Sequence, residues 1–322
     1  AVLRSLGVDP AEVLAEAGFD LRLFDNPDNQ ITYAARGRLL SHCVARTGCR
    51  HFGLLVGQQG GLYGLGLLGF LAQNSPDVQT ALQSLIRFLH LHVQGAAADL
   101  VINGEQAVFG YNIYQPHVEA SEQICDGAVA VMFNIMIALC GPGWQPTQIL
   151  FAHRKPKDVK PYRQFFRAPL FFDADQNALV FSTSWLSCRL SGANSELHRL
   201  LQKQIEALVA KYRHDFTSQV RCLLCTAIKM GHDRAEQVAG LLSMSPRTLS
   251  RRLNASGTSF HALADECRFE IARQLLETSE LNVGRIADAL NYADASAFTR
   301  AFRRWCGITP ARWRAMHDRE PG

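Results

Sequence analysis

The sequence lacks the features that mark several large classes of protein. No uninterrupted apolar run reaches 18 residues, so no membrane-spanning helix is predicted. The nine cysteines are an odd number without a disulfide-framework spacing, and no signal peptide is recognised. We therefore expect free thiols in a reducing cytosol and a cytoplasmic protein. The chain begins at Ala1 rather than Met, so residues are expected to precede it.

Catalytic and cofactor-binding motifs are also missing. The chain has neither Gly-x-Ser-x-Gly nor His-Glu-x-x-His, and no set of nucleophile, base and acid can be assembled. The glycine-rich stretch 57–69 lacks the Lys-Ser/Thr ending of a P-loop, so close backbone packing or a bend beside a pocket is expected there. Cys222 and Cys225 lack a second pair or a His cluster, which favours buried thiols. We predict no enzyme, no metal and no cofactor.

Charge is modest and unevenly distributed along the chain. The net charge is +4, and residues 215–322 hold 15 Lys and Arg against 12 Asp and Glu. Only one of those 15 cations, Lys229, is a lysine. Arginine reads guanine and phosphate better than lysine does, so this composition agrees with a nucleic-acid partner. A high-GC coding bias produces the same arginine excess.

Two segments near the C-terminus repeat one another at an offset of 48 to 49 residues. The matched pairs are Val238 and Ile286, Ala239 and Ala287, Leu242 and Leu290, and Leu253 and Phe302. Each copy reads as a short helix, a tight turn and a second helix with an arginine on its outer face. This is the layout of a helix-turn-helix, whose second helix enters the DNA major groove. Two such units predict a chain that reads two adjacent groove segments of double-stranded DNA.

The first 190 residues mix helices with strands. Apolar spacing and capping residues predict helices over 9–18, 32–47, 81–91 and 120–140. Alternation predicts a mostly antiparallel sheet from 99–102, 107–113, 148–152, 170–173 and 178–181, with a hairpin turn at Asn103-Gly104. We therefore expect an α+β domain at 1–190, a linker helix at 191–214 and an all-α domain with two helix-turn-helix units at 215–322.

The linker helix carries an apolar stripe. Its members are Leu197, Leu200, Leu201, Ile205 and Leu208. Because these residues follow the breaker cluster 191–194 at helical spacing, we predict that they pack against the N-terminal domain or a partner subunit, and a homodimer is one possibility.

The C-terminal residues resemble the AraC/XylS family of bacterial transcription regulators. The similarity runs from about Asp215 to Arg314, and its motifs are Ser-Pro-Arg-Thr-Leu-Ser-Arg at 245–251, the linking segment 268–276, residues 298–304 and Gly-Ile-Thr-Pro at 307–310. It implies a DNA-binding region in which a long helix joins two helix-turn-helix units. Two departures stand out. Asn291-Tyr292 replaces the usual Gly-Phe of the second turn, where Asn tolerates a left-handed backbone. Phe269 replaces the commoner Leu and changes core volume.

The N-terminal residues resemble the arabinose-binding-like sensor domain of one branch of this family. The motifs are residues 51–57, 64–69, 162–166 and 171–173. The resemblance implies a regulator controlled by a small-molecule effector and working with RNA polymerase, and an activator is expected because most relatives activate. Apolar and aromatic segments 62–71 and 165–172 favour an apolar or amphipathic effector over a sugar. Two alternatives stay open: an interaction or dimerisation module without a ligand, and a catalytic domain fused to a DNA-binding module.

The candidate DNA-contacting residues lie around the second helix of each unit. They are Ser245, Pro246, Arg247, Thr248, Ser250, Arg251, Asn254, Asp294, Ala295, Ser296, Thr299, Arg300 and Arg303. The first helix is richer in strong readers and also offers Arg252. Small residues such as Ala295 and Ser296 reach only a thymine methyl or one short hydrogen bond. We expect the first unit to carry most base specificity, and the second to act through Arg300, Arg303 and phosphates.

Overall fold

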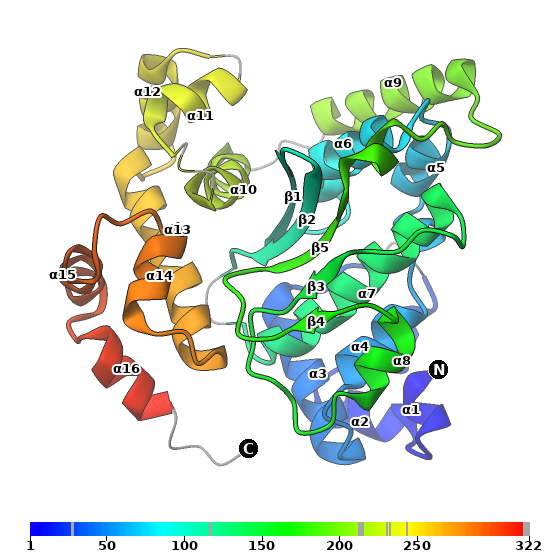
Figure 1. Ribbon diagram of the computed structural model, residues 1–322, viewed down its shortest axis with the longest axis horizontal. Helices are drawn as coiled ribbons and strands as arrows, with labels where there is room; N and C mark the ends of the chain where they lie inside the picture. Colours follow the sequence, from blue (N-terminus) through cyan, green and yellow to red (C-terminus); the bar gives the residue numbers. More distant parts are fainter. Residues whose placement is uncertain are drawn as a thin grey trace.

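The structure is a computed structural model that describes residues 1–26, 29–115, 118–211, 216–229, 231, 233–242 and 244–317. An N-terminal α+β domain lies beside a helical C-terminal domain (Figure 1). This is the fold class that the sequence predicts. The predicted boundary between residues 214 and 215 lies outside the described residues.

A five-stranded sheet forms the centre of the N-terminal domain. Its strands are β1 (Ala96–Asn103), β2 (Gln106–Ile113), β3 (Gln148–Leu150), β4 (Leu170–Phe171) and β5 (Asn177–Ser182). Their order is β1-β2-β5-β3-β4, and each neighbouring pair is antiparallel except β3 with β4. The β1–β2 hairpin pairs Asn103 with Gln106 and has a positive φ at Gly104, as the predicted turn requires. The five predicted strands are all present.

Helices surround this sheet (Figure 1). The α-helices are α1 (Val2–Ser5), α2 (Pro10–Glu16), α3 (Tyr33–Thr47), α4 (Phe52–Gln58), α5 (Leu67–Gln73), α6 (Val78–Phe88), α7 (Ser121–Cys140), α8 (Lys160–Phe166) and α9 (Ser195–Lys211), and the 3-10 turns are η1 (Leu21–Phe24), η2 (Leu62–Leu65), η3 (Leu89–Leu91) and η4 (Thr183–Ser187). Glycines allow close crossings within this set. A Cβ on Gly57 would lie 2.3 Å from the carbonyl oxygen of Gly127, and one on Gly69 would lie 1.9 Å from that of Leu62. The glycine-rich stretch therefore serves close backbone packing, as predicted.

The long helix α7 packs on β2 and β5. Among the described residues it is the one helix long and apolar enough to cross a membrane by length and composition, and 61% of its apolar window is buried inside the fold. Ile124, Val129 and Met136 are each 0% exposed. A central helix that is covered on several sides needs this composition, so burial accounts for the apolar length.

The C-terminal domain consists of helices in its described part. They are α10 (Phe216–Lys229), α11 (Ala235–Leu241), α12 (Pro246–Ala255), α13 (Phe260–Thr278), α14 (Val283–Ala289), α15 (Ala295–Cys306) and α16 (Pro310–His317). The predicted units are α11 with α12 and α14 with α15, joined by α13. Six of the residues that match between the two repeats are fully buried: Val238, Ala239, Leu253, Ile286, Ala287 and Phe302. The sequence repeat is thus a repeat of core positions.

Both departures from the family pattern fit this core. Asn291 adopts the left-handed conformation, with φ of 58°, and its side-chain amide donates to the carbonyl of Ile228. The ring of Phe269 lies 5.4 Å from that of Phe302 and 5.7 Å from that of Trp313. The larger residue therefore joins an aromatic cluster between α13, α15 and α16.

The predicted stripe on α9 is only partly buried. Leu201 and Ile205 are buried on the N-terminal domain, where α9 packs on α5. Leu197, Leu200 and Leu208 are 40%, 54% and 38% exposed. Within one chain, the prediction that the stripe packs against a neighbouring surface is therefore confirmed only for Leu201 and Ile205.

The two domains also share an apolar contact. Helix α10 packs on the edge strand β1 (Figure 1). Ala97 of β1 and Tyr114, which follows β2, belong to the same buried cluster as Val220 and Leu224 of α10. The sheet of one domain thus completes part of the core of the other.

Candidate DNA interface

The first candidate reading helix is α12. Its N-cap is Ser245, whose Oγ accepts a hydrogen bond from the backbone N of Thr248 at 3.2 Å, and Pro246 follows at the first helical position. Leu249 and Leu253 are 0% exposed and fix which side of the helix faces the core. The predicted contact residues on the other side that are exposed are Arg247, Ser250, Arg251 and Asn254. Thr248 is half-buried, with its hydroxyl 3.0 Å from that of Ser245.

The second candidate reading helix is α15, and several of its polar groups are already used. The Oδ1 of Asp294 accepts from the backbone N of Ala297 at 2.7 Å, which caps the helix. The hydroxyl of Thr299 donates to the carbonyl of Ala295 at 2.7 Å. Ser296, Arg300 and Arg303 are exposed, whereas Ala295 is half-buried. This surface offers fewer uncommitted base readers than α12, which agrees with the expected asymmetry.

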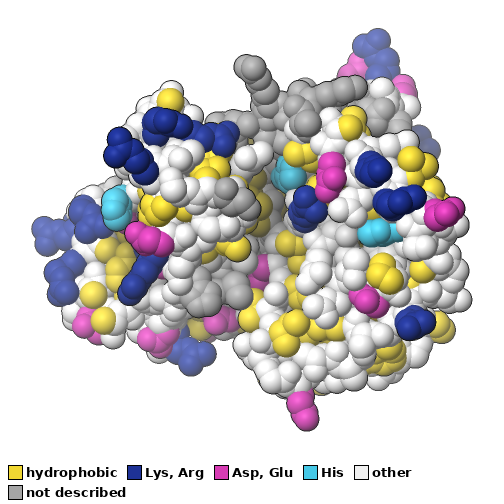
Figure 2. All heavy atoms as spheres, turned by 90° about the horizontal axis from the view of Figure 1, so that it is seen from above, with side chains coloured by type: hydrophobic (Ala, Val, Ile, Leu, Met, Phe, Trp, Pro, Cys, Tyr) yellow, Lys and Arg dark blue, Asp and Glu magenta, His cyan; other side chains and the backbone are white. Residues whose placement is uncertain are grey.

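The arginines of the two helices fall into two groups. The guanidinium of Arg252 lies 3.7 Å from the ring centroid of Phe216, and that of Arg304 lies 3.0 Å from Asp265. Arg252 is thus held against α10, which distinguishes it from the other candidate arginines of α12. The candidate contacts Arg247, Arg251, Arg300 and Arg303 form no ion pair with any residue that the structure describes. Figure 2 shows Lys and Arg side chains gathered on the outer rim of the C-terminal domain, on the left of the view.

A buried charge network on α13 links this helix to α16. The guanidinium of Arg273 bonds both carboxylate oxygens of Glu270, at 3.1 and 2.5 Å, and also pairs with Glu277. Trp313 of α16 donates from its indole nitrogen to Glu277 at 3.1 Å. Glu270 and Arg273 are 3% and 7% exposed. The network fixes α16 on α13 through charge-assisted hydrogen bonds, which are the stronger kind.

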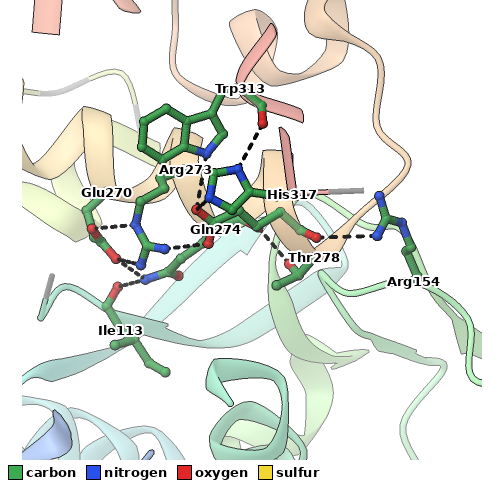
Figure 3. Close-up of polar contacts among 9 residues, drawn as sticks. Ile113, Arg154, Glu270, Arg273, Gln274, Thr278, Trp313 and His317 are labelled. Atoms are coloured by element: carbon green, nitrogen blue, oxygen red, sulfur yellow. Dashed lines mark hydrogen bonds and ion pairs between the residues drawn. The ribbon is translucent and has the colours of Figure 1, made fainter. Parts of the chain in front are cut away.

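Polar contacts tie the C-terminal half of α13 to the N-terminal domain (Figure 3). Gln274 donates from Nε2 to the carbonyl of Ile113, at the end of β2, at 3.1 Å. The backbone N of Arg154 donates to the carbonyl of Thr278 at 2.5 Å, and its guanidinium lies 3.4 Å from the carbonyl of Glu277. The backbone N of Glu280 donates to Oδ1 of Asp173 at 2.7 Å. On the side of the N-terminal domain these contacts come from a strand end and loops, where no periodic pattern predicts a contact with a distant helix.

A second buried cluster lies in the N-terminal domain. Asp126 of α7 accepts from Nε2 of His153 at 2.8 Å and from the hydroxyl of Tyr162 at 2.5 Å. Burial alone would lower the pKa of His153, but the adjoining carboxylate of Asp126 raises it to about 9. The protonated ring then also donates to the carbonyl of Arg154 at 2.8 Å. All three residues are at most 7% exposed, so the cluster braces α7, α8 and the chain after β3 rather than meeting a substrate.

In the described part of the chain, the thiol and acidic side chains form no metal site. No group of three or more His, Cys, Asp or Glu there lies close enough to hold a metal ion. Cys225 is buried, and burial raises the pKa of the Cys222 thiol to about 11. A thiol with such a pKa stays protonated at neutral pH and is a poor metal ligand and nucleophile.

The two domains match known families separately. Residues 7–190 match the model of the arabinose-binding domain of AraC transcription regulators, and residues 238–316 match a helix-turn-helix domain. The chain belongs to the AraC family of transcription regulators. It is therefore a DNA-binding regulator and not an enzyme, and the alternative of a catalytic N-terminal domain is dropped.

Similar full-length regulators cover nearly the whole chain. The ornithine utilization regulator of Pseudomonas aeruginosa is 27% identical over 294 residues, which cover 91% of this chain and 86% of that protein. The regulator VirS of Mycobacterium tuberculosis is 27% identical over 318 residues, covering 98% and 93%. Among solved structures, the regulator CdpR of Pseudomonas aeruginosa aligns over 98% of this chain and 95% of that one, with 21% identity and a TM-score of 0.48.

Proposed function

We propose that this AraC-family regulator is a transcription activator controlled by a small-molecule effector. In this proposal residues 1–190 bind the effector, 191–214 link the domains, and 215–322 bind promoter DNA and work with RNA polymerase. The observation that carries it is the polar interface on α13. That helix joins the two helix-turn-helix units, and its C-terminal half is bonded to the N-terminal domain through Gln274, Thr278 and the chain just beyond.

Effector control needs a ligand that distinguishes two arrangements of this interface. A ligand shifts a conformational equilibrium only by its difference in affinity for the two states. Because α13 fixes the second unit relative to the first, a small rotation of the helix changes whether both units fit successive major-groove segments. Such segments lie about 34 Å apart on one face of B-DNA. In this proposal the interface contacts couple the N-terminal domain to DNA affinity.

Two measurements on the intact chain test this proposal. Operator DNA is first selected from a random pool, and transcription by RNA polymerase is measured from a weak promoter placed beside it. A thermal-shift screen against metabolites then finds ligands, since a 100-fold excess over Kd adds about 2.7 kcal/mol of stability. A ligand that stabilises the protein and raises transcript yield supports the proposal. A regulator that lowers transcription, or one that no stabilising ligand affects, contradicts it.

The two reading helices are expected to contribute unequally to specificity. Scrambling the operator half-site under α12 should abolish specific binding, because Arg247 and Arg251 are exposed and uncommitted there. Scrambling the half-site under α15 should weaken binding by a smaller factor. Arg303→Ala should lower affinity on all sequences and flatten the salt slope by about one unit, as expected for loss of one phosphate contact. Footprinting and titration check this, and equal sensitivity at both half-sites would contradict the asymmetry.

The second candidate role of the N-terminal domain is self-association without a ligand. The exposed leucines of α9, Leu197, Leu200 and Leu208, favour it, because three apolar side chains on one helix face are suited to a partner helix. Leu200→Glu is expected to convert a dimer into a monomer in sedimentation equilibrium while the circular dichroism spectrum of the folded chain is retained. Arg199→Gln changes the charge equally on a neighbouring face and should leave the dimer intact. A wild-type chain that is monomeric at high concentration would remove this role.

A further inference from the structure

A basic groove lies on the surface of the N-terminal domain between α8 and β4. Its lining includes the apolar residues Leu170, Phe171 and Phe172, which we call the floor, and the cations Lys155, Arg163 and Arg167, which we call the rim. The groove holds about 680 Å³, within the range of small-molecule sites. The cleft between the two domains, beside Gln274, holds only about 30 Å³, room for about one water molecule.

The cations on the rim are not neutralised by neighbours. Lys155, Arg163 and Arg167 are exposed, and no residue within the described ranges forms an ion pair with them. Residues 155–167 contain five Lys and Arg but one acid, Asp158, whose carboxylate accepts from the backbone N of Lys160. Asp173, the acidic residue that lines the groove, accepts from the backbone of Glu280. The groove therefore presents a net positive potential to a ligand.

The floor is apolar and fixed in place. Phe171 is 47% exposed on the edge strand, and the ring of Phe172 stacks on Phe151 at 5.2 Å. The walls are braced from below, because Asp126 bonds both Tyr162 of α8 and His153, two residues before Lys155. An exposed aromatic floor within a rigid wall suits the apolar body of a small molecule.

The backbone at Arg167 is a further indication. It ends α8 in the left-handed conformation, with φ of 51°, at the position where helices commonly place glycine. Holding a long side chain there strains the backbone, and such strain clusters at ligand sites. The side chain that results lines the groove.

We propose that this groove binds a small organic anion with an apolar body, and that it is the effector site of the regulator. The identification as an effector site rests on the proposed function. A carboxylate or phosphate head would pair with Arg163 and Arg167, and the apolar body would cover Phe171. The groove adjoins the interface with α13 at two places, since Asp173 bonds Glu280 and Lys155 follows Arg154. A ligand in the groove therefore lies beside the contacts that hold the linking helix.

Calorimetric titration of the intact chain tests the binding site. The probes are naphthylacetate and naphthyl phosphate, with naphthylmethylamine and inorganic phosphate as control ligands. We expect saturable binding of at least one aryl anion at about 1 mM or below, with little binding of either control. The tighter of the two anions identifies the head group. Equal binding of the amine, or inorganic phosphate binding as tightly as the aryl anions, would overturn the proposal.

Variants locate the site on this groove. Arg163→Gln is expected to weaken binding of the aryl anion about tenfold, the effect of one charge-assisted hydrogen bond. Lys160→Gln removes the same charge from the same helix at a position that does not line the groove, and should change binding less than twofold. Phe171→Ser should also weaken binding. If Lys160→Gln weakened binding as much as Arg163→Gln, the attraction would be general and the site would be wrong.

Arg167→Gly separates binding from folding. Glycine relieves the left-handed strain, so the melting temperature should rise by about 1–3 °C while anion affinity falls. A fall in both the melting temperature and the anion affinity, or an unchanged anion affinity, would contradict the role of Arg167. Operator affinity is then measured with and without saturating anion. If the groove binds but operator affinity does not change, the site stands and its effector role fails. If the groove does not bind, the proposed effector control remains open to the metabolite screen.

Discussion

Arg251→Ala is expected to weaken binding to the selected operator by about 5- to 150-fold, the effect of losing 1–3 kcal/mol. Arg251 is exposed in the middle of α12, on the side opposite the buried Leu249 and Leu253, and has no ion-pair partner within the described residues. A guanidinium in this position can bond the O6 and N7 of a guanine in the major groove. Truncation should therefore relax base preference at one operator position, measured by repeating the selection at fixed salt.

Arg252→Ala is the matched control for this experiment. It removes the same charge from the next residue, but its guanidinium lies over the ring of Phe216 rather than on the reading face. We expect a loss of stability of about 0.5–1 kcal/mol from the lost cation–π contact, an affinity change of at most a few fold, and no change in base preference. An Arg251→Ala protein with unchanged affinity and preference would remove α12 from the interface.

The fold and the two candidate reading helices could be predicted because local rules determine where helices and strands form. Residues such as Val238, Ile286, Leu253 and Phe302 recur because both units need the same buried positions, and a helical period exposes the remaining positions in a known order. The N-caps at Ser245 and Asp294 follow from short-range hydrogen bonding. These interactions span a few residues, so the pattern along the chain contains them.

The remaining features depend on contacts between distant residues. Arg252 lies over Phe216, and Gln274 bonds Ile113, which is 161 positions away. The basic groove illustrates the same limit: the aromatic segment 165–172 predicted an apolar or amphipathic effector, but most of its rings are used in the core. The ring of Phe171 remains exposed, and the three rim cations line the same groove. The folding of the backbone, and not the sequence pattern, brings these residues together.

The buried Asp126 is expected to give the largest effect on stability. Asp126→Asn should lower the free energy of unfolding by about 3 kcal/mol at pH 7, because it removes the charged partner of a buried, protonated His153. Chemical denaturation followed by circular dichroism measures this loss. Asp175→Asn is the control, since Asp175 is exposed and its neutralisation should change stability by less than about 0.5 kcal/mol.

The pH dependence of the same pair has a definite sign. The pKa of His153 is raised from 6.5 to about 9 in the folded state, so the folded protein binds more protons than the unfolded chain between these values. The stabilisation is fully present below about pH 6.5 and is lost as the pH rises through about 9. Between pH 7 and 9.5, the free energy of unfolding of the wild-type protein should therefore fall by about 1–3 kcal/mol more than that of the Asp126→Asn protein. Glu122 also favours the protonated ring and remains in both proteins, so the difference isolates the contribution of Asp126. If the difference in free energy of unfolding between the two proteins stayed constant or widened as the pH rises, His153 would not be charged in the folded protein.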